Sequence, residues 1–173
     1  ADTSSMDATT TDAPGTPTEC TLATWLEKAL AGCKELKGAD LEQADLAGAN
    51  LVGVDLTDAF LYHTILTNAD LRESKLVNAM MKGADLTQAK LVDANLSHAD
   101  LSEASLYEAD LEGANLTNAD LMYTNLIGTN LQGANLTGVN WEFTPCPDGT
   151  SSHSNGGTCC GHLLGKVPSA GCD

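Results

Sequence analysis

Residues 84–103 read ADLTQAKLVDANLSHADLSE, which is four five-residue units that share one pattern. Each unit opens with alanine, has a mostly polar second residue and carries leucine in third place. The spacing continues without a slip from Leu36 to Trp141, over 22 positions of which 20 are leucine and two are Met81 and Trp141. So regular a short period indicates a repeat architecture and decides the fold class.

A period of five fits neither an α-helix nor a flat strand, whose side chains repeat every 3.6 and every 2 residues. Either structure would expose most of the leucines, at a cost of about 1.5–3 kcal/mol each. The pattern predicts instead a chain that bends once in every unit. Leucine and the small residue two positions before it then point inward. Four units close a square coil, so that residue i lies beside residue i+20.

Units such as Ala69–Glu73 (ADLRE) and Ala114–Asn118 (ANLTN) match the motif A(D/N)LXX. In this motif the chain resembles the pentapeptide repeat family, over about residues 34–143. The resemblance implies an all-β solenoid, a right-handed quadrilateral β-helix. It also implies that the Asp or Asn before each leucine holds a corner of the coil, which is a structural role. To this fold the flanking residues add an N-terminal α-helical cap and a Cys-rich C-terminal cap.

The N-terminal flank divides into two parts. Residues 1–19 are rich in Thr, Asp and Pro and poor in apolar residues, which predicts a flexible arm. Residues 20–33 are predicted to form a helical cap, with Thr24 and Glu27 as a capping box. The apolar stripe expected to cover the first coil has helical spacing. It consists of Leu22, Trp25, Leu26, Ala29 and Leu30.

The C-terminal flank, residues 144–173, abandons the repeat and is rich in Gly, Ser and Pro, which predicts a looped cap stapled by disulfides. We expect three apolar side chains to cover the last coil. They are Leu163, Leu164 and Val167.

The six cysteines all lie in the two flanks, where folding needs most help, and the even number predicts disulfides and an oxidising compartment. They are Cys20, Cys33, Cys146, Cys159, Cys160 and Cys172. The simplest of the fifteen pairings joins Cys20 to Cys33 and pairs the other four among themselves. A straight helix from 20 to 33 would hold that first pair about 20 Å apart, so Cys20 must fold back or pair elsewhere. The competing hypothesis is zinc bound with His153 and His162, but the spacing fits no common zinc motif.

Composition argues against several functions. The formal net charge is −16, which excludes a direct nucleic-acid binder, and apolar runs are too short for membrane insertion. His63 and His98 fall on different faces by the twenty-residue rule, so no catalytic set forms. We expect ion ladders instead, with Lys75 beside Asp55 and Lys90 between Asp70 and Asp110. The sequence therefore predicts no enzyme, no cofactor and no metal.

Some units replace the polar residue before leucine by an apolar one. Phe60 and Met80 are twenty residues apart and so stack on one face, and Ile65 lies round the next corner. These and their neighbours predict an apolar strip, a partner-surface candidate. The alternatives are cover by the N-terminal arm, or drift at tolerant positions. The strip consists of Phe60, Tyr62, Ile65, Met80, Met122 and Tyr123.

The function predicted from these features is a non-enzymatic structural or protein-interaction module. It docks an unidentified protein partner through the apolar strip, as part of a larger complex. The cysteines favour an extracytoplasmic site, which is secreted, periplasmic or thylakoid-lumenal. The alternative is a DNA mimic that inhibits or protects a type II topoisomerase, since some members of the resembled family act so and the acidic rod suits that role. Six cysteines argue against it, because that target lies in the reducing cytoplasm.

Overall fold

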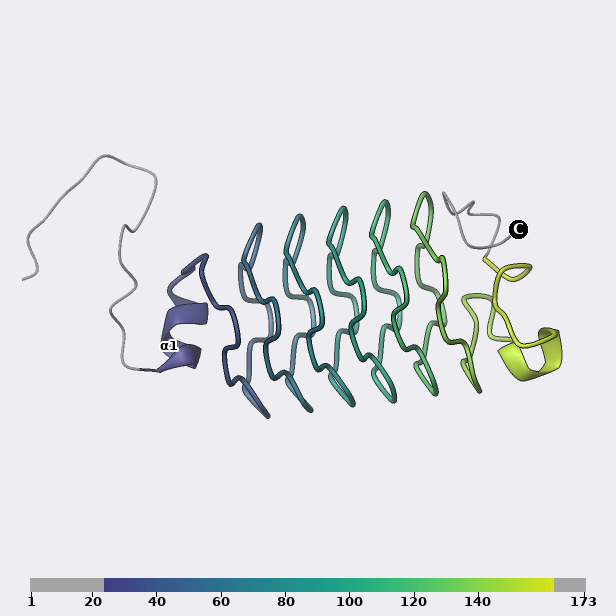
Figure 1. Cartoon of the computed structure of the whole chain (residues 1–173), viewed down its shortest axis with the longest axis horizontal. Coiled ribbons are helices and arrows are strands. Elements are labelled where there is room, and N and C mark those ends of the chain that lie inside the picture. Colours follow the sequence, from purple (N-terminus) through teal and green to yellow (C-terminus); the bar gives the residue numbers. More distant parts are fainter. Residues whose placement is uncertain (1–23, 164–173) are drawn as a thin grey trace, which may run out of the picture.

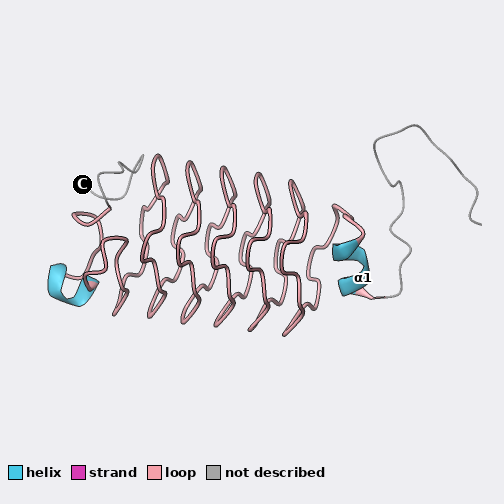
Figure 2. Ribbon diagram, turned by 180° about the vertical axis from the view of Figure 1, so that it is seen from behind, coloured by secondary structure: helices cyan, strands magenta, loops and turns pink. Residues whose placement is uncertain are grey.

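The computed structural model describes residues 24–163, which form a rod of stacked coils with a small cap at each end (Figure 1). Eighteen parallel β-bridges join residue i to residue i+20, from Glu35 and Asp55 to Asp120 and Asn140. Each bridge stands alone, so the coils appear as loops without strand arrows in Figure 2. The twenty-residue coil predicted from the repeat is confirmed.

Backbone hydrogen bonds between neighbouring coils hold each side of the square. The Leu36 N–H donates to Asp55 O at 2.8 Å, and the Asp55 N–H donates to Lys34 O at 2.7 Å. At each corner the chain turns through a left-handed residue two positions after leucine, as at Gln43 with φ 56°. All 22 units share this feature. Glycine has no steric penalty in that conformation, which explains why it recurs there.

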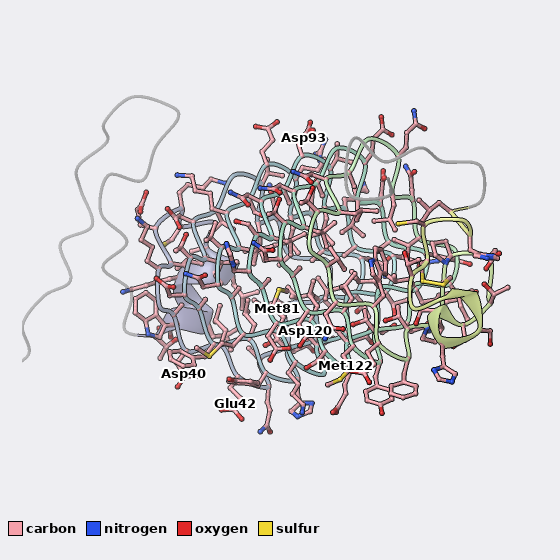
Figure 3. The ribbon with its side chains drawn as sticks, turned by 45° about the vertical axis from the view of Figure 1, so that its right-hand side comes forward. Asp40, Glu42, Met81, Asp93, Asp120 and Met122 are labelled. Atoms are coloured by element: carbon pink, nitrogen blue, oxygen red, sulfur yellow. A yellow bond between two sulfur atoms is a disulfide. The ribbon has the colours of Figure 1, made fainter. Side chains whose placement is uncertain are left out.

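The core is a column of leucines running the length of the rod. Every leucine of the repeat is at most 2% exposed, and Trp141 closes the column at 6%. Met81 replaces one leucine and lies inside the coil (Figure 3). Alanines two positions before leucine are mostly buried as well, because small side chains let the backbone pass close to the core.

Asp and Asn before leucine hold the corners, as the resemblance implied. In all fifteen units that carry one, the side-chain oxygen accepts a hydrogen bond from the backbone N–H two residues later. Asn125, for example, accepts from the Ile127 N–H at 3.1 Å. Such side-chain caps supply an acceptor for a backbone N–H that would otherwise have no hydrogen-bond partner within the turn.

The N-terminal helix α1 spans Trp25–Leu30 and begins with the predicted capping box of Thr24 and Glu27. The expected stripe is wrong in two places, because Leu26 is 36% and Leu30 is 60% exposed. The helix makes fewer than two turns and ends at Leu30, and Gly32, with a φ of 77°, then redirects the chain. Only Ala29 of the helix is therefore fully buried, with Trp25 half-buried against the core. Leu22 lies outside the described residues.

The coil geometry continues one unit past residue 143, where the sequence pattern ends. Pro145 O accepts from the Leu126 N–H at 3.0 Å, as a repeat residue would. Cys146 takes the place of leucine and is fully buried. It forms a disulfide with Cys159, which ties the following loop, with the 3-10 helix η1 (Ser152–Asn155), to the last coil.

Leu163 is 4% exposed and covers the end of the core as predicted, while Leu164 and Val167 lie outside the described residues. Cys33 and Cys160 are disulfide-bonded too. Their partners lie outside the part of the chain that the structure describes.

Candidate functional site: an interrupted apolar face

Seven of the 22 units lack Asp or Asn before leucine, and five of these lie between residues 60 and 90. These five side chains do not cap the corner, so their units lack the hydrogen bond that the Asp and Asn units make. The five residues are apolar or basic. They are Phe60, Ile65, Lys75, Met80 and Lys90.

The first apolar patch, here the N-terminal patch, consists of Phe60, Tyr62 and Met80. Phe60 is 41% exposed and pairs with Met80 through a backbone bridge to the next coil. The Tyr62 hydroxyl lies 3.0 Å from the Met80 sulfur, so the corner side chain leans onto the face. The three form one continuous surface across two coils.

The second patch, here the C-terminal patch, consists of Met122, Tyr123 and Phe143. The Tyr123 and Phe143 rings stack at 5.1 Å, and Phe143 stacks on His153 of η1 at 5.3 Å. Tyr123 is nevertheless 52% exposed. Phe143 and His153 were not predicted as members of this stack, although the twenty-residue spacing from Tyr123 to Phe143 was a usable signal.

Both patches lie on the same side of the rod, but the strip between them is interrupted. Bridges link Met80 to Asp100 and Asp100 to Asp120 along the face. At the adjoining corner Lys82 and Glu103 form an ion pair of 3.0 Å. Figure 3 shows Met122 on the same edge of the rod as Asp40 and Glu42, with Asp93 on the opposite edge.

Further apolar side chains lie round the corner from these patches. Ile65 is 40% exposed on the next face, and Tyr107 and Ile127 are 38% and 37% exposed at the corner beyond it. Tyr107 and Ile127 were not predicted as part of the apolar strip. They too are twenty residues apart and so occupy one column.

Charge divides the rod along its length. Residues 72–90 contain four of the eight Lys and Arg, whereas residues 91–165 contain none and carry nine acids. Arg72 binds Asp70 through two hydrogen bonds of 2.8 and 2.7 Å, which lower the pKa of Asp70. The band that carries the N-terminal patch is thus close to neutral in an otherwise acidic protein.

The predicted ion ladder around Asp55 is present. Lys37 and Lys75 each lie 3.5 Å from its carboxylate, which is almost fully buried. Burial acts to raise the pKa of Asp55, but hydrogen bonds from Thr57 and the two ammonium groups outweigh it and lower the pKa. Lys90 lies between Asp70 and Asp110 through backbone bridges, as the register predicted. The predicted ion pairs of Lys90 do not form, because among the described residues no carboxylate lies within ion-pair distance of its ammonium group.

The histidines do not converge on one site. His63 and His98 lie at corners of different faces, and His153 belongs to the ring stack. His162 lies 2.6 Å from Asp148. The carboxyl of Asp148 has a pKa of about 2, mainly because Thr150 donates to it.

Within residues 24–163 no group of three or more His, Cys, Asp or Glu could hold a metal ion. In the same range no helix has the length and apolar character to cross a bilayer.

A family model for pentapeptide repeats matches residues 35–72, 64–102, 79–118 and 99–138, in eight copies. The chain belongs to the pentapeptide repeat family. Its members fold as right-handed quadrilateral β-helices and are generally structural or interaction modules.

Solved structures of similar proteins come from plants and bacteria. A pentapeptide repeat protein from the thylakoid lumen of Arabidopsis thaliana is 32% identical, with 60% of this chain and 69% of that chain covered and a TM-score of 0.47. Rfr23 from the cyanobacterium Cyanothece is 30% identical, with 81% and 84% covered and a TM-score of 0.47.

QnrB1, a plasmid-mediated fluoroquinolone resistance protein, is 15% identical to this pentapeptide repeat protein, with 79% and 81% covered and a TM-score of 0.46. Comparison with curated proteins gives no match.

Proposed function

We propose that this pentapeptide repeat protein is a non-enzymatic interaction module of an extracytoplasmic compartment, which docks a protein partner through its apolar face. The observation that carries the proposal is the loss of corner caps in five units between residues 60 and 90. A side chain that caps a backbone N–H at the start of a helix contributes about 0.5–2 kcal/mol to stability, and we take the same range for these corners. Phe60 and Met80 give up this contribution and expose apolar surface instead, which favours a role in binding over one in folding.

The disulfides support an oxidising location. Cys146 and Cys159 are joined, and Cys33 and Cys160 are bonded as well. Disulfides of this structural kind persist in secreted, periplasmic and lumenal proteins and are rare in the cytoplasm.

The second candidate is a DNA mimic that acts on a type II topoisomerase. The absence of Lys and Arg from residues 91–165 favours it, because that half of the rod is uniformly anionic. The four cations at residues 72–90 argue against it, because they interrupt the anionic surface that a mimic of duplex DNA needs.

Affinity capture from an extract of the source organism tests the docking function. The bait is the disulfide-bonded protein, and the test variant carries Phe60→Asn with Met80→Asp. Both replacements restore a capping side chain, so the fold should persist while the apolar patch is lost. Lys90→Asn is the matched control, because it adds a cap on the opposite face and leaves the patch intact.

We expect wild type and Lys90→Asn to retain the same partner and the double variant to lose it. Capture that is equal for all three baits would contradict the docking function. A supercoiling assay with purified gyrase tests the second candidate. Inhibition or protection at micromolar protein would favour the DNA mimic over the docking module.

A further inference from the structure

The two apolar patches share one side of the rod with a set of carboxylates that lie between and beyond them. Backbone bridges join Phe60, Met80, Asp100 and Asp120 in successive coils, and the corner residues after them follow the same order. The docking face, as we call it, consists of residues 40, 42 and 43 and those that follow at steps of twenty up to 140, 142 and 143. It carries one ammonium group, that of Lys82, and six carboxylates. The carboxylates belong to Asp40, Glu42, Asp100, Glu103, Asp120 and Glu142.

Two of these carboxylates, those of Asp100 and Asp120, are neighbours across a backbone bridge and lie between the patches. Each accepts the backbone N–H two residues later at 2.9 Å, and Asp120 also accepts from the Asn140 amide at 2.9 Å. The Lys82 ammonium group pairs with Glu103 at 3.0 Å. Among the described residues no Lys, Arg or His lies within ion-pair distance of Asp100 or Asp120. The fold therefore leaves negative charge between the two patches without a paired cation.

This charge argues against the chain itself as the occupant of the docking face. Residues 1–19 contain four acids and no Lys or Arg, so the N-terminal arm would bring like charges to the face. A second copy would bring the same six carboxylates. Juxtaposed like charges oppose association, whereas complementary charges steer partners together and fix their register. An occupant that covers both patches must accordingly supply cations between its apolar groups.

We propose that the docking face binds a cationic peptide segment of another protein. Its Lys or Arg side chains pair with Asp100 and Asp120, while apolar side chains on either side of them contact the two patches. The proposal rests on the docking function and names the chemistry of the partner. The levels of Phe60 and Phe143 are four coil steps apart, which is about 19 Å at about 4.8 Å per step. An extended segment crosses that distance with about six residues at about 3.3 Å each.

Fluorescence anisotropy with a labelled synthetic peptide of about ten residues tests this chemistry directly. The probe has two leucines at each end and two arginines at its centre. We expect saturable binding to the disulfide-bonded wild-type protein, and weaker binding when the salt rises from about 50 to about 500 mM. A peptide with glutamates in place of the arginines should not bind, and one with serines in place of the leucines should bind more weakly. No binding of the first peptide overturns the proposal.

A pair of double variants tests whether the charge acts on this face alone. Asp100→Asn with Asp120→Asn removes two charges from the docking face, and asparagine can still cap each corner. The matched control is Asp85→Asn with Asp110→Asn, which removes two charges at the same place in units of the other faces. We expect the first variant to bind the arginine peptide at least about fivefold more weakly and the control to stay within about twofold of wild type. An equal loss in both variants would show general attraction to an acidic protein and overturn the proposal.

The contribution of the apolar anchor is tested without a change of charge. Phe60→Asn with Met80→Asn should weaken the arginine peptide at least about tenfold, and unchanged affinity would overturn the proposal. Circular dichroism confirms that each variant keeps the wild-type fold. Capture from extract separates this proposal from the docking function. If Phe60→Asn with Met80→Asp loses a partner that Asp100→Asn with Asp120→Asn retains, the docking function stands and the cationic segment is wrong.

Discussion

The Thr64 hydroxyl donates a hydrogen bond of 2.8 Å to the backbone carbonyl of Leu41, at a buried place where most units carry alanine. Thr124, Thr129 and Thr144 make the same contact in their own coils. Ser74 occupies the equivalent position and is 1% exposed, but its hydroxyl has no partner within the described chain. A buried polar group without a hydrogen bond is destabilising.

Replacing Ser74 by alanine should therefore raise the free energy of unfolding, by about 1–3 kcal/mol. Alanine is the usual residue at this position, so the change creates no steric conflict. Urea unfolding followed by circular dichroism measures the effect. Thr64→Ala is the control and should lower stability, because it removes the buried hydrogen bond to the Leu41 carbonyl, which then keeps only the Ala44 N–H as donor. A Ser74→Ala protein less stable than wild type would contradict this account of the site.

Restoring corner caps should stabilise the rod. Phe60→Asn and Lys90→Asn each supply an acceptor for the backbone N–H two residues later, and each should gain about 0.5–2 kcal/mol. Asn125→Ala removes the cap on Ile127 and should lose a similar amount. Thermal melts of the three single variants give the comparison. If Phe60→Asn lost stability while Lys90→Asn gained it, Phe60 would be a packing residue and not a docking residue.

Acid should weaken the C-terminal cap. The pKa of Asp148 is lowered to about 2 from an ordinary 3.8, so its contribution is complete above pH 3.8 and disappears as the pH falls toward 2. The lowered pKa of Asp55 acts in the same direction at the other end of the rod. Hydrogen exchange at residues 146–163, measured at pH 5, pH 3 and pH 2, should show falling protection. Asp148→Asn should flatten this dependence, and an unchanged pH profile in that variant would contradict the assignment.

Reduction should loosen the same cap. The Cys146–Cys159 disulfide closes a loop of 13 residues, and a bridge of that span contributes about 3 kcal/mol. We expect dithiothreitol, or Cys146→Ser with Cys159→Ser, to lower the melting temperature while the coil signal persists. Non-reducing peptide mapping should recover this pair, together with Cys20–Cys33 and Cys160–Cys172 as the remaining bridges. A Cys159–Cys172 peptide would contradict the pairing.

The coil and its core followed from the leucine spacing, because one bend per unit is the arrangement that buries every leucine. The N-terminal stripe could not be predicted in full, because helical periodicity at Leu26 and Leu30 does not reveal that the helix ends after six residues. The last unit was missed because Pro145 and Cys146 replace the motif residues while the backbone keeps its path. The interruption of the strip could have been predicted, because the twenty-residue register places Lys82 and Glu103 between the two patches.

The bridge from each residue to its counterpart twenty positions on has a consequence for how such a protein can change length. Deleting a single quintet would rotate everything downstream by a quarter turn and carry Tyr123 and Phe143 away from the side that holds Phe60. An insertion leaves both patches on the same side of the rod only if it adds a whole coil of twenty residues. The distance between the two patches along the rod can therefore change only by whole coils if both patches are to stay on one side.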